Sequence, residues 1–122
     1  MANQINLNPR RILLIDDEPD VRAAIGFVLR FDKHTVVEAG SGREALELFQ
    51  PGKFDLVITD YLMPEIRGDK LAAIIKRLDP AQPILMVSGS AVLLDASTLQ
   101  ADALLAKPFS LAELRQFIAQ LQ

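Results

Sequence analysis

Three carboxylates, a hydroxyl and a lysine stand where short apolar runs of this sequence end. They are Asp16 and Asp17 after ILLI, Asp60 after LVIT, Ser88 at the end of ILMVS and Lys107 after ALLA. Clustered carboxylates repel one another unless a cation neutralises them, and an all-oxygen site suits Mg2+ with several retained waters. A carboxylate nucleophile beside a metal, a lysine and a hydroxyl could accept a phosphoryl group, because these groups stabilise the charge on its oxygens.

Each of these residues alone also has a structural explanation. Asp16 or Asp17 could cap the following helix, because aspartate favours helix starts. Asp60 and Ser88 could be turn residues, and Lys107 could be a solvated surface charge. These explanations do not account for an acidic pair, a third carboxylate, a hydroxyl and a lysine in one small chain, so the combination is far more specific than any member.

The elements that must position these residues follow a regular alternation. Runs of strand length are ILLI (12–15), TVVEA (35–39), LVIT (56–59), ILMVS (84–88) and ALLA (103–106). Between and after them, apolar residues repeat at three and four residues, as in Val21, Ile25, Val28 and Leu29, which is the period of a helix with one buried face. Parallel strands need crossover helices, and these bury both faces of the sheet. The sequence therefore predicts an α/β fold with a five-stranded parallel, doubly wound sheet, in which ligands bind at the carboxyl ends of the strands.

Length and composition indicate one globular domain. The chain has 122 residues, of which 50% are hydrophobic and 24% charged, and a single core of this size is common. Residues 1–9 carry no clear period, so we expect an N-terminal extension there and one domain over residues 10–122. For the segment 91–100 we expect a short helix, and for the sole histidine, His34, a surface position.

Charge and hydropathy argue against several classes of function. The formal net charge of -3 gives no attraction toward nucleic-acid backbones, so we expect no direct nucleic-acid binding. No stretch approaches the roughly 20 apolar residues that span a bilayer, so we expect no membrane insertion. The absence of cysteine excludes thiol catalysis and fits a reducing compartment, and a cytoplasmic location is the expectation.

Four segments resemble the motifs of the receiver domains of two-component response regulators. LLIDDEPDVR, LVITDYLMPEIRG, MVSGS and ALLAKPFS are similar to the acidic-pair, phosphoacceptor, hydroxyl and lysine-proline motifs of that family, and they stand in its order. The match runs from about Arg11 to Leu121. The resemblance implies the flavodoxin-like receiver fold of chemotaxis-regulator-like proteins.

The resemblance also implies a metal site and a phosphoacceptor. Asp60 would be phosphorylated by a sensor histidine kinase or a phosphotransfer protein, in a reaction that depends on Mg2+. The ion would be coordinated by Asp17, Asp60 and the main-chain carbonyl of Leu62, with Asp16 acting mainly through a metal-bound water. The chain would catalyse nothing beyond its own phosphorylation and dephosphorylation, and it would signal to a downstream protein effector.

Ser88 and Lys107 would serve the phosphoryl group itself. By the resemblance, the Ser88 hydroxyl donates a hydrogen bond to that group, and Lys107 pairs with one of its oxygens. The Lys107-Pro108 bond is expected to be cis, as in the family, because proline reduces the preference for trans to roughly 0.5 to 1 kcal/mol.

Three features depart from the family pattern. Arg67 stands where the family often has Asp or Asn, a position outside the metal site. Leu104 stands where the family often carries a Tyr or Phe whose rotation reports phosphorylation. The 19 positions from Ser88 to Lys107 are a few fewer than usual, which predicts that the fourth helix is short or irregular.

Two other functions compete with the phosphoacceptor interpretation. A haloacid-dehalogenase-type enzyme would also use an aspartyl phosphate and Mg2+, but it requires D-x-D after a strand, and Asp-Asp-Glu at 16–18 and Asp-Tyr-Leu at 60–62 do not match. A degenerate receiver could act as a constitutive protein-interaction module, for which Leu104 and the shortened segment are the motive. Retention of all five site residues argues against this second alternative.

Overall fold

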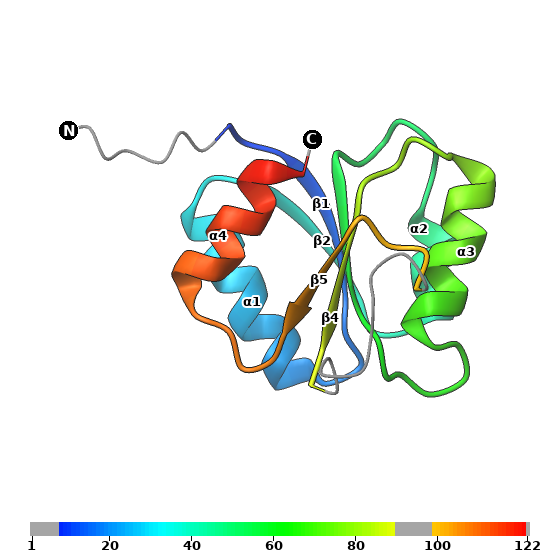
Figure 1. The fold of residues 1–122 in the computed structure, drawn as a ribbon, viewed down its shortest axis with the longest axis horizontal. Helices are drawn as coiled ribbons and strands as arrows, with labels where there is room; N and C mark the ends of the chain where they lie inside the picture. The colour runs from blue at the N-terminus through cyan, green and yellow to red at the C-terminus, as the bar shows by residue number, and fades with distance from the viewer. Residues whose placement is uncertain (1–7, 90–98, 122) are drawn as a thin grey trace.

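Five parallel strands form the centre of the molecule, and the computed structural model describes residues 8–89 and 99–121 (Figure 1). The elements in chain order are β1 Arg11–Ile15, α1 Pro19–Phe31, β2 Thr35–Ala39, α2 Gly42–Leu48, β3 Leu56–Asp60, α3 Gly68–Leu78, β4 Ile84–Ser88, β5 Ala103–Ala106 and α4 Leu111–Gln120. The strand order is β2-β1-β3-β4-β5, and every neighbouring pair is parallel. The predicted doubly wound sheet is confirmed.

Two expectations fall on parts of the chain that the structure does not describe. The predicted N-terminal extension over residues 1–9 coincides largely with residues 1–7, and the predicted short helix over 91–100 coincides largely with residues 90–98. Both ranges lie outside the described residues. In residues 8–89 and 99–121, no helix is long and apolar enough to cross a membrane.

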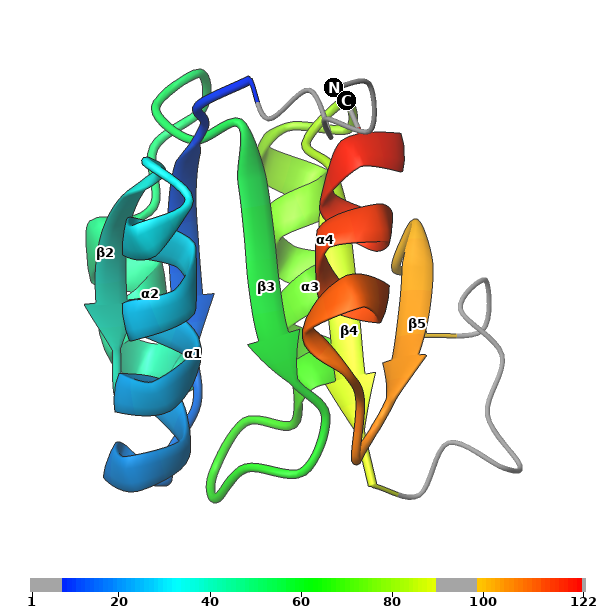
Figure 2. The ribbon, with the colours of Figure 1, turned by 90° about the vertical axis from the view of Figure 1, so that its left-hand side faces the viewer.

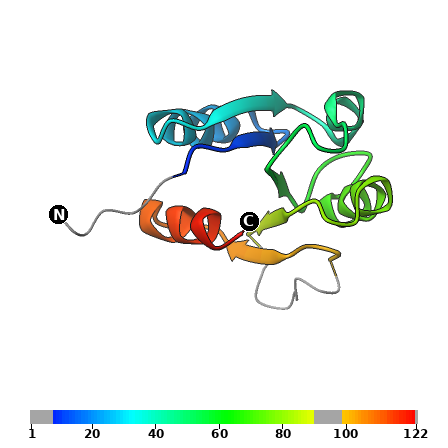
Figure 3. The same ribbon diagram turned by 90° about the horizontal axis from the view of Figure 1, so that it is seen from above.

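Helices cover both faces of the sheet. Helices α1 and α4 lie on one face and α2 and α3 on the other, as the views from the side and from above show (Figures 2 and 3). Successive side chains of a strand point to opposite faces, so Leu13 and Ile15 join the core under α2 and α3, while Ile12 and Leu14 join the core under α1 and α4. Covering both faces explains why the strands read as continuous apolar runs.

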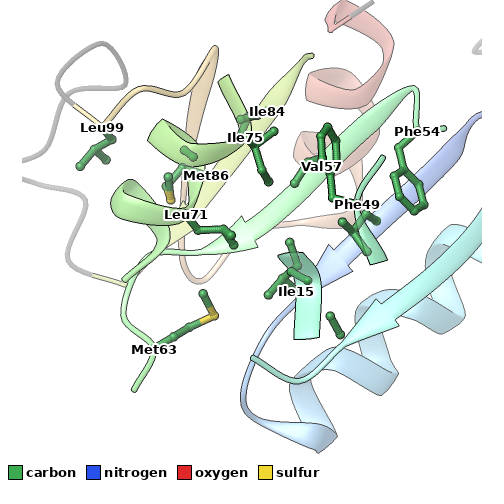
Figure 4. Packing of buried hydrophobic residues seen from close by; sticks show 14 residues of the cluster. Ile15, Phe49, Phe54, Val57, Met63, Leu71, Ile75, Ile84, Met86 and Leu99 are labelled. Carbon is green, nitrogen blue, oxygen red and sulfur yellow. The ribbon is translucent and has the colours of Figure 1, made fainter. Parts of the chain in front are cut away.

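The core under α2 and α3 reaches from one end of the sheet to the other (Figure 4). Val57 of β3 and Met86 of β4 pack there against Leu71 and Ile75 of α3, and all four side chains are buried. Phe49 and Phe54 lie at one end of this core with their ring centroids 6.3 Å apart. Leu104, which stands where the family often has an aromatic residue, packs partly buried against the same core.

The start of α1 shows whether Asp16 or Asp17 caps this helix, as the structural explanation of the acidic pair required. Glu18 occupies the N-cap position without a side-chain cap hydrogen bond, and Pro19 follows it. Neither Asp16 nor Asp17 is therefore the N-cap, although Oδ1 of Asp16 accepts a hydrogen bond from the Glu18 amide at 2.9 Å. Asp17 instead lines a cleft beyond the strand ends.

The expectation that His34 lies at the surface is wrong. Its side chain is buried, and Nδ1 accepts a hydrogen bond from the main-chain amide of Arg10 at 3.0 Å. Burial lowers the pKa of His34, and the charge of Arg10 adds to that effect while Asp32 opposes it. The polar sequence around His34 gave no sign of this burial. His34 directly precedes β2, and the chain turns back after α1 so that the histidine lies beside Arg10, which directly precedes β1.

The reversal of strand order creates the place for a site. The chain passes from β1 to β2 on one side and from β3 to β4 and β5 on the other. The loops that leave β1 and β3 therefore diverge, and in doubly wound sheets the crevice between such loops is where ligands bind. The carboxyl ends of the strands meet at one edge, at the bottom of Figure 2.

Candidate functional site

All five residues singled out in the sequence lie at the carboxyl edge of the sheet. Asp16 and Asp17 follow β1, Asp60 is the last residue of β3, Ser88 is the last residue of β4, and Lys107 follows β5. The register pairs Asp60 with Val87, and the amide of Lys107 donates to the carbonyl of Ser88 at 2.9 Å. Four of the five line a cleft of about 360 Å³, whose lining residues are Asp17, Glu18, Asp60, Leu62, Ser88, Gly89 and Lys107.

Three carboxylates converge in this cleft. Asp16, Asp17 and Asp60 each offer an oxygen, and these oxygens lie within 4.8 Å of one another. Asp16 and Asp60 are buried, with 2% and 8% of their surface exposed. Like charges this close destabilise one another unless a cation compensates them, and burial strengthens the effect because the solvent no longer screens it.

Lys107 partly compensates that charge. Its Nζ lies 3.1 Å from Oδ1 of Asp60 and 3.7 Å from Oδ2 of Asp16. Burial lowers the pKa of Lys107, but the hydrogen bond and the charge of Asp60, with help from Asp16, outweigh burial and leave this pKa raised. Within the described part of the chain, Lys107 thus pairs with two of the three carboxylates, and an excess of negative charge remains.

The pKa of Asp60 is raised mainly by burial, and the excess negative charge adds to the rise. Burial raises the pKa of its carboxyl group, Lys107 opposes the rise, and the neighbouring charges of Asp16 and Asp17 add to it. The net direction is upward, so the ionised form of Asp60 is disfavoured in the cleft as it stands. A further cation near the three carboxylates would reverse that preference.

The donor set fits a hard divalent cation. Carboxylate oxygens are the ligands that Mg2+ takes, usually one or two of them with waters and a phosphate in the remaining positions. Asp16, Asp17 and Asp60 could supply such oxygens, and Leu62 lines the same cleft with an exposed side chain. The shared excess charge and the all-oxygen chemistry therefore agree with the ion that the sequence led us to expect.

Ser88 and the peptide bond after Lys107 complete the cleft on the side of β4 and β5. Ser88 is 1% exposed and ends β4, so its hydroxyl is held at the strand exit. The Lys107-Pro108 peptide bond is cis, which confirms the expectation. Arg67 lies away from the three carboxylates, paired with Asp69 at 2.9 Å and stacked over the ring of Tyr61 at 5.6 Å.

Two residues of the site were missed by reasoning from the sequence. Glu18 lines the cleft, and its place in the acidic run DDE could have indicated this from the sequence. Gly68 supports Asp60 from behind, because its amide donates to the carbonyl of Tyr61 at 2.7 Å and a Cβ there would lie 2.2 Å from the carbonyl oxygen of Asp60. Any side chain at Gly68 would therefore displace the backbone of Asp60.

The fold and the cleft define a class of protein, namely flavodoxin-like α/β domains with an acidic site at the carboxyl edge of a parallel sheet. A family model described as the response regulator receiver domain matches residues 12–119, nearly the whole chain. This chain therefore belongs to the response regulator receiver domain family. The match confirms the resemblance inferred from the four motifs.

The chain is similar to parts of two kinds of longer protein. The chain is 37% identical over 115 residues to the sensor kinase CckA of Brucella abortus, covering 90% of this chain and 12% of that protein. It is 38% identical over 109 residues to the transcriptional regulatory protein PdtaR of Mycobacterium tuberculosis, covering 87% of this chain and 53% of that protein. This chain thus spans about half or less of either relative.

One solved structure with the same fold is a response regulator in complex with Mg(2+)-BeF. The response regulator protein TrrA of Thermotoga maritima, in complex with Mg(2+)-BeF, is 33% identical, with a TM-score of 0.84 over 93% of this chain and 99% of that chain. Receiver domains interact with histidine kinases and with effectors, and the relatives include both a sensor kinase and transcriptional regulators.

Proposed function

We propose that Asp60 of this receiver domain accepts a phosphoryl group from a sensor histidine kinase or a phosphotransfer protein, and that the modification switches binding to a downstream protein effector. The observation that carries the proposal is the position of the Asp60 carboxylate, which lies 3.1 Å from the Lys107 ammonium at the mouth of an acidic cleft. The domain would comprise residues 10–122, with residues 1–9 as an extension.

Asp16, Asp17, Asp60 and the main-chain carbonyl of Leu62 would hold Mg2+, with Asp16 acting mainly through a bound water. When bound, the ion supplies positive charge that stabilises the oxygens of the moving phosphoryl group. The shared charge of the three carboxylates supports this assignment, as does the Mg(2+)-BeF complex of the similar protein TrrA.

The residues of the chain itself then perform the transfer. An oxygen of the Asp60 carboxylate attacks phosphorus, an O-P bond forms, and the P-N bond of the donor phosphohistidine breaks with its electron pair left on the imidazole. Lys107 pairs with a phosphoryl oxygen, and the Ser88 hydroxyl donates a hydrogen bond to another. Because these groups are already held at the strand ends, little reorganisation is needed.

Neither competing function is favoured by an observation in the structure. The family match is to receiver domains, and it gives no support to a catalytic activity beyond reactions of the domain's own phosphoryl group. An interaction module that takes no phosphoryl group would have no need for the cluster that Asp16, Asp17 and Asp60 form. The cytoplasmic location stays a prediction.

A small phosphodonor tests the proposal without knowledge of the kinase. Acetyl phosphate with Mg2+ should raise the intact mass of the protein by one phosphoryl group, and the Asp60→Asn variant should show no increase. Lys107→Ala and Ser88→Ala should still bind Mg2+ and be impaired in phosphorylation. Equal labelling of Asp60→Asn and the parent protein would contradict the assignment, as would labelling that survives a chelator.

A further inference from the structure

We propose that Arg22 is a positioning residue for the metal site, because it fixes the peptide group that joins Asp16 to Asp17. This role rests on the proposed function of the cleft. Nη1 of Arg22 donates to the carbonyl oxygen of Asp16 at 2.7 Å, and Nε of the same guanidinium donates to Oε1 of Glu38 at 3.1 Å. Arg22 itself does not line the cleft.

The contact falls on the link between the two proposed metal-binding carboxylates. A peptide group is planar, so fixing the carbonyl of Asp16 also fixes the direction in which the chain continues to Asp17. Asp16 is otherwise held by its amide, which donates to the carbonyl of Ala39 at 3.2 Å, and by its carboxylate, which accepts from the Glu18 amide. These bonds hold Asp16, whereas the bond from Arg22 acts on the peptide that leads to Asp17.

Glu38 of β2 anchors the guanidinium in this orientation. Its carboxylate accepts from Nε of Arg22 through one oxygen and from Nη1 of Arg30 through the other, the second bond at 2.9 Å. Burial raises the pKa of Glu38, but its hydrogen bonds to Arg30 and Arg22 outweigh burial and leave this pKa lowered. Glu38 therefore holds Arg22 as a charged acceptor, and Arg30 is a second partner that has no contact with Asp16 among the hydrogen bonds described.

Two glycines leave the space that this arrangement needs. A Cβ at Gly26, inside α1, would lie 2.9 Å from Oε2 of Glu38 and 3.0 Å from Nη1 of Arg30. A Cβ at Gly40 would lie 3.1 Å from Nη1 of Arg22. Glycine weakens a helix relative to alanine, so its presence at position 26 fits a need for close approach of Glu38 rather than a preference of the helix.

Positioning and simple electrostatics predict opposite effects of removing Arg22. A guanidinium near a cation site repels the cation, so its loss should strengthen Mg2+ binding if charge alone matters. If Arg22 orients the Asp16-Asp17 peptide, its loss should weaken Mg2+ binding, as loss of a group that orients metal ligands generally does. The sign of the change separates the two roles.

The test compares Arg22→Ala with Arg30→Ala, because each variant removes one arginine from Glu38. Mg2+ affinity can be followed by the fluorescence of Tyr61, which adjoins Asp60 and is the sole tyrosine in a chain without tryptophan, and checked by calorimetry. Arg22→Ala should bind Mg2+ about tenfold more weakly than the parent protein. Arg30→Ala should stay within about twofold, because it does not touch Asp16.

Arg22→Lys gives a second reading that does not depend on charge. A lysine keeps the charge but offers one compact group, which cannot hold Glu38 and the Asp16 carbonyl in the fixed geometry of a guanidinium. The Mg2+ affinity of Arg22→Lys should therefore be as low as that of Arg22→Ala. If circular dichroism shows that Arg22→Ala does not fold, the Mg2+ affinity of Arg22→Lys tests the positioning role in its place. Equal or tighter Mg2+ binding by the folded Arg22 variants, or an equal loss in Arg30→Ala, would overturn the positioning role. A parent protein that is not phosphorylated on Asp60 would instead overturn the proposed function.

Discussion

The two edges of the sheet carry charges in different arrangements. At the amino edge, two carboxylates each have an arginine partner of their own: Arg11 pairs with Asp55 through two hydrogen bonds of its guanidinium, and Arg115 pairs with Asp32 at 2.7 and 2.8 Å. At the carboxyl edge, within the described residues, Lys107 pairs with two carboxylates, Asp60 at 3.1 Å and Asp16 at 3.7 Å, and Asp17 is a third carboxylate in the same cluster.

This difference distinguishes ion pairs that stabilise the fold from charged residues that form a ligand-binding site. Arg115 joins α4 to the end of α1, and its two bonds satisfy a carboxylate that is almost fully buried. The cleft has no such balance, because Lys107 pairs with both Asp60 and Asp16 and a third carboxylate, Asp17, lies close to them. A site that a cation completes therefore has more carboxylates than basic groups, whereas a structural ion pair has equal numbers.

The largest expected effect comes from breaking the balanced pair. Arg115→Ala leaves the buried carboxylate of Asp32 without its partner, which should lower the free energy of unfolding by about 3 kcal/mol. Urea unfolding would measure the loss, which should be the same with and without Mg2+, since the pair lies at the opposite edge from the cleft. A loss that Mg2+ restores would contradict the separation of the two edges.

Mg2+ itself should stabilise the fold through the unbalanced cluster. At a free concentration about 100 times the Kd, the ion should raise the free energy of unfolding of the parent protein by about 2.7 kcal/mol. Asp17→Ala should lose most of this gain because it removes one of the three carboxylates, whereas Lys107→Ala should keep it. The same gain in Asp17→Ala and in the parent protein would show that Mg2+ binds elsewhere.

The smallest expected effect is a dependence of stability on pH at the two ends of β3. Burial raises the pKa of Asp60, so the stability that this group contributes falls as pH rises from the ordinary carboxyl range through the raised pKa. The hydrogen bond from Arg11 lowers the pKa of Asp55, so its contribution is present above the ordinary value and is lost as pH falls through the lowered pKa.

Two asparagine variants, unfolded by urea in metal-free buffer across this range, would separate these contributions. Relative to the parent protein, Asp60→Asn should become more stable as pH rises, because it removes a carboxylate whose ionised form is disfavoured. Asp55→Asn should lose stability relative to the parent protein as pH rises from the lowered pKa of Asp55 to the ordinary carboxyl value, a range that lies below the one for Asp60. Curves for both variants that run parallel to that of the parent protein would refute the contrast.

The strands could be predicted closely because both faces of the sheet are buried. Each strand is a short apolar run bounded by polar residues, and the runs 35–39, 84–88 and 103–106 coincide with β2, β4 and β5. The last strand residue of β3 is Asp60 itself rather than the residue before it. Helix α2 ends at Leu48, and Phe49 directly after it is buried in the core.

The sequence could identify the residues at the site but not the contacts that orient them. The acidic pair, Asp60, Ser88 and Lys107 were recognisable by type and by place after apolar runs. The burial of His34 depends on its contact with Arg10, which is far away in the sequence. The contact of Arg22 with the Asp16 carbonyl depends on how α1 packs beside β1. Local periodicity contains no information on such contacts, so they required the folded chain.

The central claim is that the unbalanced carboxyl edge makes Asp60 the phosphoacceptor. The most direct measurement treats the protein with acetyl phosphate and Mg2+, reduces the acyl phosphate with borohydride, and locates the resulting homoserine by peptide mass spectrometry. We predict homoserine at position 60 and unmodified aspartate at positions 16 and 17. Homoserine at either of those positions, or none at position 60 in a protein whose intact mass has risen, would contradict the account.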